Sequence, residues 1–321
     1  MYFLIKYLIR KWREHKARRD GAAIGEDADA LDDSEPAAPD TARFSAAAGG
    51  SGHAAKRSAA SRGPIGLLAH QVRYDLLASV RNPRARFFTF FFPILLLVVF
   101  NAAFGNGHTM IDGVRVKLKV FYVPGILTMS VVVAAYAGLV ISMSALRESG
   151  VLKRRRATPV PPALLIAGQA LSTVVTTTLM AAVLLVLAKV AYGVGLGAGA
   201  ILAVGCIVVI GTISFACIAY AVSGLIGSPE AAQPITQATM FPLWFISGVF
   251  IPIPNLPSVL RHIGDVFPVS HLSNSLHLAV VHGTFGAAIS VTDVIVLVAW
   301  ALGAGAFAAW RFSWLPSTAT A

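Results

Sequence analysis

Long apolar runs, separated by shorter stretches that hold most of the charged residues and prolines, set the pattern of this sequence. A helix needs roughly 20 mainly apolar residues to cross the hydrocarbon core of a bilayer. Runs of about this length predict six transmembrane helices, over residues 87–104, 122–146, 163–189, 200–226, 235–251 and 291–310. The predicted fold class is therefore an all-α integral membrane protein.

A shorter periodic segment precedes the first run. Ile65, Leu68 and Val72 recur at helical spacing with polar residues between them. The pair Asn82-Pro83 ends this helix, because a residue before proline avoids the helical conformation. We expect a cytoplasmic amphipathic helix that lies along the inner membrane surface. A helix packed against other helices would show the same pattern.

The stretch between the fifth and sixth runs is too polar and too often broken by proline to span a membrane, yet it is rich in apolar residues. Leu256, Val259 and Ile263 fall on one helical face. We expect two short helices that dip into the outer leaflet and are joined at Phe267-Pro268.

The N-terminal part has a different character. Residues 1–20 begin apolar and then become strongly basic, which reverses the order of a secretory signal and favours a weak interfacial helix. Residues 21–62 have few large apolar residues, so we expect disorder. The predicted division is a basic, disordered extension over 1–64, a transmembrane domain over 65–316 and a short tail over 317–321.

Composition supports the membrane class and places the chain in the bilayer. Apolar residues make up 56% of the sequence and charged residues only 13%, which is outside the range of soluble proteins. The net charge of +11 does not indicate nucleic acid, since basic residues gather before the first run and beside the others. The short basic loop 147–162 should stay in the cytoplasm. We therefore expect a multi-pass plasma-membrane protein with both termini cytoplasmic and with contacts to membrane lipids.

Catalytic chemistry is not indicated. Four histidines lie near the sixth run, but their separations are not the i, i+4 spacing that places two ligands on one helix face. These residues are His262, His271, His277 and His282. We expect no metal and no catalytic residue. Asp293 starts the last run and acids are otherwise almost absent from the runs, which does not favour proton coupling.

Uncharged polar residues interrupt two of the apolar runs. Thr173 and Thr177 lie in the third run, and Thr236, Gln237 and Thr239 lie in the fifth. Such residues commonly hold transmembrane helices together. The alternative interpretation is that some of them line a path for an amphiphilic substrate.

Two motifs resemble the permease subunits of ABC-2-type exporters of the daunorubicin-resistance kind. The loop RESGVLKRRRATPVPP is similar to their Arg-Glu-x-Gly-x-Leu-x-Arg-x-x-x-Thr-Pro block, with matches at Arg147, Glu148, Gly150, Leu152, Thr158 and Pro159. The stretch MFPLWFISGVFIP is similar to their Ser-Gly-x-x-x-Pro motif, with matches at Ser247, Gly248 and Pro252. The resemblance covers about residues 65–316, and the N-terminal extension departs from it.

The resemblance implies a six-span half-transporter that works as a homodimer or pairs with a second permease. It also implies that a separate ATP-binding cassette subunit docks on the inner surface, where the loop 147–162 contains the coupling helix. The sequence agrees, because it contains no GxxxxGK[ST] phosphate-binding loop. ATP and Mg would be bound by the partner subunit, and this chain would carry no cofactor and no enzyme activity of its own.

The predicted function is export of a hydrophobic or amphiphilic compound, such as a drug, lipid or glycolipid, outward across the plasma membrane. A polysaccharide or glycoconjugate export permease of the same superfamily is the nearest alternative. A membrane scaffold that transports nothing is an alternative from another class.

Overall fold

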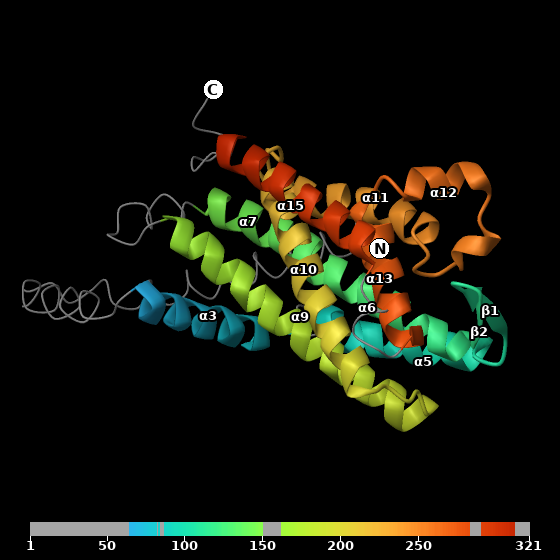
Figure 1. The fold of residues 1–321 in the computed structure, drawn as a ribbon. Helices are drawn as coiled ribbons and strands as arrows, with labels where there is room; N and C mark the ends of the chain where they lie inside the picture. The colour runs from blue at the N-terminus through green and yellow to red at the C-terminus, as the bar shows by residue number, and fades with distance from the viewer. Residues whose placement is uncertain (1–63, 82, 84–86, 150–161, 283–289, 312–321) are drawn as a thin grey trace, which may run out of the picture. The chain divides into compact units, whose positions relative to one another are not determined.

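Long helices packed along one another dominate the computed structural model (Figure 1). The structure describes residues 64–81, 83, 87–149, 162–282 and 290–311, all within the unit Arg62–Ala321. The features expected of residues 1–63 and of the tail 317–321 lie outside the described residues. The helices are α3 (Pro64–Arg81), η1 (Phe87–Phe91), α5 (Phe92–Phe104), α6 (Leu118–Val132), η2 (Val133–Gly138), α7 (Leu139–Glu148), α9 (Pro162–Tyr192), α10 (Ala198–Ser223), α11 (Pro229–Ile246), η3 (Ile253–Asn255), α12 (Ser258–Gly264), α13 (Pro268–His282) and α15 (Val291–Arg311).

Five helical stretches in the described residues are long and apolar enough to cross a membrane. They are Phe87–Phe104, Leu118–Glu148, Ile166–Tyr192, Ala198–Ser223 and Val291–Trp310. These stretches match five of the six predicted spans. The membrane class is therefore confirmed, and the count of six remains a prediction.

The predicted fifth span forms helix α11, which is not among those five. Ser228 caps its start by accepting a hydrogen bond from the Ala231 amide at 3.4 Å. Pro234 and Pro242 lie inside the helix, and the helix ends at Ile246 before Gly248, whose φ is +72°. These prolines remove two backbone donors from the helix, and Gln233 and Gln237 lower its apolar content.

The interior of the bundle is formed by the second span and by α10. The second span has 72% of its most apolar window buried, against 11% for the span in α15. Helix α10 packs against α7, α9, α13 and α15. A helix that is apolar all round is suited to such a central place.

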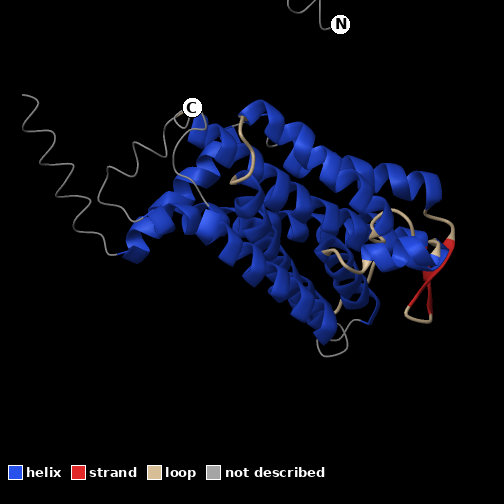
Figure 2. Cartoon of the chain, turned by 90° about the horizontal axis from the view of Figure 1, so that it is seen from above, coloured by secondary structure: helices blue, strands red, loops and turns tan. Residues whose placement is uncertain are grey.

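A short β-hairpin corrects the all-α prediction. Strands β1 (His108–Ile111) and β2 (Val114–Lys117) pair antiparallel between α5 and α6, and Figure 2 shows them at one end of the helices. Asp112 and Gly113 form the two-residue turn with φ of +46° and +75°. Positive φ at both central residues defines a type I′ turn, for which Asp-Gly is a favoured sequence.

The two helices predicted between the fifth and sixth spans are confirmed as α12 and α13, joined at Phe267-Pro268. Val259 and Ile263 on α12 are exposed, whereas α13 packs against α6, α10 and α15 and is mostly buried. The position of α12 in the outer leaflet stays a prediction. Helix α13 is part of the interior.

The predicted helix before the first span is confirmed as α3, which packs along α9. Gly168 of α9 permits the close approach, because a Cβ there would lie 2.7 Å from Cγ of Gln71. The contact with α9 agrees with the alternative interpretation of the sequence pattern, a helix packed against other helices. The cytoplasmic location of α3 stays a prediction.

The crossing of α11 can be tested by labelling. In a Cys206→Ser, Cys217→Ser background, single cysteines at Glu230 and Ser258 would be exposed to a membrane-impermeant maleimide on vesicles of known orientation. If α11 crosses the bilayer, as six spans require, the two positions react from opposite sides. Asn106→Cys is the control, and it should share the side of Ser258. Labelling of Glu230 and Ser258 from the same side would establish five spans.

Candidate functional site

Two neighbouring residues of the predicted coupling motif have different surroundings. Arg147 lies in the last turn of α7 and is only 7% exposed. Its guanidinium donates hydrogen bonds to the carbonyl oxygens of Ser223, at 3.0 Å, and of Ile226. Ser223 is the last residue of α10, so the arginine satisfies carbonyls at the negative end of that helix. Glu148 is exposed.

The two residues therefore have different roles: Arg147 holds helices together, and Glu148 is accessible at the surface. Arg147 ties the C-terminal end of the second span to α10, and its side chain is not open to a partner. Glu148 remains free to meet another protein. The other motif residues, Gly150, Leu152, Thr158 and Pro159, lie outside the described residues, and their coupling role stays a prediction.

The residues predicted to line a substrate path lie on two helices, α9 and α11. In the first group, the Thr177 hydroxyl lies 2.9 Å from that of Thr212 and joins α9 to α10, whereas Thr173 bonds the carbonyl of Gln169 in its own helix. Thr177 and Thr212 are both buried. These contacts are those of residues that hold helices together.

The second group lies on α11. The Thr239 hydroxyl is 3.0 Å from the Tyr136 hydroxyl, which joins α11 to η2. Thr236 is buried and bonds carbonyls of its own helix, and Gln237 is exposed. A role of either group in a substrate path stays a prediction, but Gln237 and Thr239 have the exposure that such a role requires.

A π-helical segment, η2, interrupts the second span where Tyr136 meets Thr239. Such segments are rare and are frequent at functional sites. The apolar sequence of 133–138 carries no signal for a π-helix, so this feature was not predicted. Tyr136 itself was a detectable signal, because a tyrosine hydroxyl in an apolar run needs a partner.

The predicted outer motif follows α11 and fixes a tight turn. Ser247, Gly248 and Pro252 are all buried, and a Cβ on Gly248 would lie 2.8 Å from Cγ1 of Ile253. Gly125 of α6 and Gly264 of α12 leave room for the backbone of residues 246–249, where any Cβ would meet a carbonyl oxygen. The motif therefore interlocks α11 with α6 and α12.

A polar cluster between α13 and α15 was not predicted as a unit. His271 Nδ1 lies 2.6 Å from Oδ1 of Asp293, and His271 Nε2 lies 2.8 Å from the carbonyl oxygen of Asp265. Asn274 donates to the other Asp293 oxygen at 2.7 Å. Because both ring nitrogens face acceptors, both donate only when His271 is an imidazolium.

The hydrogen bond to Asp293 raises the pKa of His271 above its ordinary value of 6.5, while burial opposes the shift. His271 lies on α13, outside the candidate spans. The sequence signal for this cluster was Asp293, because a lone acid at the start of an apolar run needs a partner. Sequence spacing could not identify that partner, since it lies 22 residues away on another helix.

The remaining three histidines each have a different neighbour. His262 Nδ1 lies 2.7 Å from the Ser258 carbonyl of its own helix, and His282 Nε2 lies 3.0 Å from Oδ2 of Asp112 in the hairpin turn. His277 faces the Ser273 carbonyl, and burial lowers its pKa to about 4. Among the described residues, no group of three or more His, Cys, Asp or Glu side chains could hold a metal ion.

Several long apolar helices, joined by two hydroxyl pairs and by the buried Arg147, define a multi-pass membrane protein. Residues 68–281 match the ABC-2 type transporter family, and the chain belongs to that family. The chain is thus a membrane component of an ABC transporter rather than its catalytic part. The family also implies association with an ATP-binding subunit. The family resemblance seen in the sequence motifs is confirmed.

One relative illustrates the family. Over 197 residues the chain is 27% identical to the daunorubicin resistance ABC transporter permease protein DrrB1 of Streptomyces coeruleorubidus. The aligned stretch covers 60% of this chain and 67% of that protein.

Replacing Arg147 tests its structural role. Arg147→Gln should lower the free energy of unfolding by about 2–3 kcal/mol, because carbonyl groups at the end of α10 lose a charged donor. Denaturant unfolding of the purified protein in detergent measures this. Arg115→Gln, which removes an exposed arginine from β2, is the matched control and should change little. Equal stability of the two variants would contradict the role of Arg147 as a cap.

The His271–Asp293 pair predicts a pH dependence. A raised pKa in the folded state contributes stability that is fully present below pH 6.5 and is lost as the pH rises through the folded value. The Tm in detergent should therefore decline above pH 6.5 in the wild type and much less in His271→Gln. His262→Gln, at an exposed histidine of α12, should keep the wild-type slope. The prediction fails if both variants retain that slope.

Proposed function

We propose that this chain is the permease of an ATP-driven exporter that moves a hydrophobic or amphiphilic compound outward across the plasma membrane. The observation that carries the proposal is the match of residues 68–281 to the ABC-2 type transporter family. The name of the relative, a daunorubicin resistance permease, supports a drug, lipid or glycolipid as the cargo class. ATP and Mg are bound by a separate subunit, and a second permease, identical or different, completes the transporter.

The inner end of the second span provides a route for the energy of ATP hydrolysis. Glu148 is accessible to a basic group of the ATP-binding subunit, and it lies at the start of the predicted coupling loop 147–162. Arg147, the preceding residue, is bonded to carbonyls at the end of α10. Since α10 also packs against α9, α13 and α15, a displacement of the loop would be passed to the centre of the bundle. This is the coupling step that we propose.

The cargo is proposed to pass along the exposed face of α11. Gln233, Gln237, Phe241 and Phe245 are all exposed and follow one another at intervals of four residues, which places them on one helix face. Amide groups occupy one half of this stripe and aromatic rings the other. A face with polar and aromatic halves fits an amphiphilic molecule. A second permease opposite α11 would close the path and keep these amides away from lipid.

Glu148 supplies the first test of coupling. Glu148→Gln should insert normally, but permease-stimulated ATP hydrolysis and efflux of an amphiphilic dye such as daunorubicin should both fall about tenfold, because a charged contact is worth roughly 1.5–3 kcal/mol. The assay uses membranes with matched amounts of permease and of the ATP-binding subunit. Glu230→Gln is the control, since Glu230 is also exposed but lies at the start of α11.

Two outcomes would revise the proposal in different ways. Unchanged efflux in Glu148→Gln would remove this residue from coupling and leave export intact. Absence of ATP-dependent efflux in the wild type, in the presence of its ATP-binding subunit and across drug, lipid and glycolipid probes, would contradict export. The scaffold alternative would then account for the membrane domain.

A further inference from the structure

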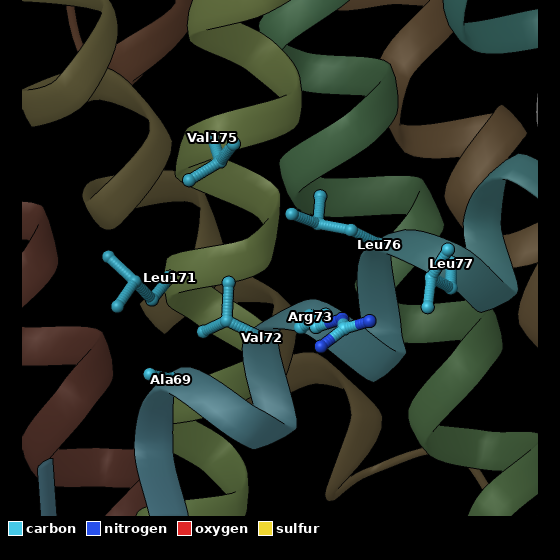
Figure 3. Close-up of a pocket in the computed structure, with 7 residues that line it drawn as sticks. All are labelled: Ala69, Val72, Arg73, Leu76, Leu77, Leu171 and Val175. Atoms are coloured by element: carbon cyan, nitrogen blue, oxygen red, sulfur yellow. The ribbon is translucent and has the colours of Figure 1, made fainter. Parts of the chain in front are cut away.

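A groove of about 530 Å³ opens between α3 and α9 (Figure 3). Its lining on α3 repeats at helical spacing, and its lining on α9 consists of two residues one turn apart. The lining residues are Ala69, Val72, Arg73, Leu76, Leu77, Leu171 and Val175. The groove is thus formed by two apolar helix stripes that meet at an angle, with a single charged side chain among them.

The apolar walls of the groove remain accessible. Leu77, Leu171 and Val175 keep 46%, 41% and 41% of their surface exposed. The groove is separate from the coupling residues and from the stripe proposed for the cargo, which lie on α7 and α11. None of the functions considered so far uses it.

Arg73 gives the groove its chemical selectivity. Within the described part of the chain its guanidinium has no hydrogen-bond or ion-pair partner. An arginine stem can lie along apolar surface while the guanidinium reaches the headgroup level of a bilayer. Guanidinium groups bind phosphate oxygens through charge-assisted, often bidentate hydrogen bonds.

The α9 wall of the groove belongs to a helix that is long and apolar enough to cross a membrane. Leu171 and Val175 both lie within its candidate span, Ile166–Tyr192. An acyl chain of the surrounding bilayer therefore meets apolar side chains on this wall.

We infer that the groove between α3 and α9 binds an anionic phospholipid of the surrounding bilayer, with an acyl chain against the apolar walls and the phosphate on Arg73. The charge complementarity between a lone guanidinium and an anionic headgroup selects this occupant. A zwitterionic lipid would fill the same walls, but its own cation would compete for the phosphate. The bound lipid would hold α3 against the transmembrane bundle.

Native mass spectrometry of the purified full chain provides the test. The protein is incubated in detergent with equal amounts of palmitoyl-oleoyl phosphatidylglycerol and phosphatidylcholine, and the retained lipids are counted. The wild type should prefer phosphatidylglycerol. Arg73→Gln should lower its retention about fivefold and leave phosphatidylcholine unchanged, because one arginine near a lipid surface contributes on this scale. Arg73→Lys should restore most of the retention.

Two further variants separate the groove from general attraction of lipid to a basic surface. Arg81→Gln removes the same charge from an exposed position of α3 outside the groove and should retain lipid as the wild type does. Leu171→Trp fills the groove from α9 and should lower the retention of both lipids. Thermal unfolding without added lipid verifies that each variant is folded.

Several results would overturn the inference. Equal losses in Arg73→Gln and Arg81→Gln would indicate surface attraction, and full retention in Leu171→Trp would place the acyl chain elsewhere. Displacement of phosphatidylglycerol by glycerol phosphate, which has the anionic group without an acyl chain, would reduce the site to an anion site. The measurement needs neither an ATP-binding subunit nor transport, so its outcome is independent of the proposed export.

Discussion

The hydrogen bonds between the Arg147 guanidinium and the carbonyls at the end of α10 connect the two most buried candidate spans of the bundle. A helix end in apolar surroundings leaves carbonyl groups without partners, and a buried guanidinium is equally in need of acceptors. Each therefore compensates the other. Because α10 also packs against α9, α13 and α15, this contact fixes the C-terminal end of the second span relative to most of the bundle.

Every buried polar group needs a hydrogen-bond partner, and this need also determines the contacts of the hydroxyl groups in the spans. Thr128 and Ser130 bond carbonyls four residues earlier in α6, at 2.9 and 2.8 Å, so they remain satisfied in any apolar environment. Hydroxyl groups that bond to another helix are fewer, and they show which helices are neighbours. Besides the two hydroxyl pairs described above, Ser214 of α10 donates to the Leu297 carbonyl of α15 at 2.8 Å and so defines that neighbour.

The sequence predicted the elements well and the contacts poorly. Apolar length identified five spans, and helical spacing identified α3, α12 and α13. The same pattern could not show that α13 is interior, since its serines and His277 make it look polar and only its neighbours bury it. The Asp112-Gly113 turn was a detectable signal, but each strand beside it has only four residues, which is too few for a clear alternating pattern. For the candidate site, the motif indicated Arg147 and Glu148 together, while their opposite burial depends on where α10 ends, which no local pattern reveals.

The π-helical segment η2 determines the rotational phase of everything that follows it in the second span. A wide turn holds one more residue than an α-helical turn, and each residue of an α-helix advances the side-chain direction by about 100°. With a regular α-helix through 133–138, Arg147 would point to another azimuth and miss the carbonyls of α10. The π-helical segment is thus a phase adjustment, which allows Tyr136 to meet Thr239 of α11 and Arg147 to meet the carbonyls at the end of α10.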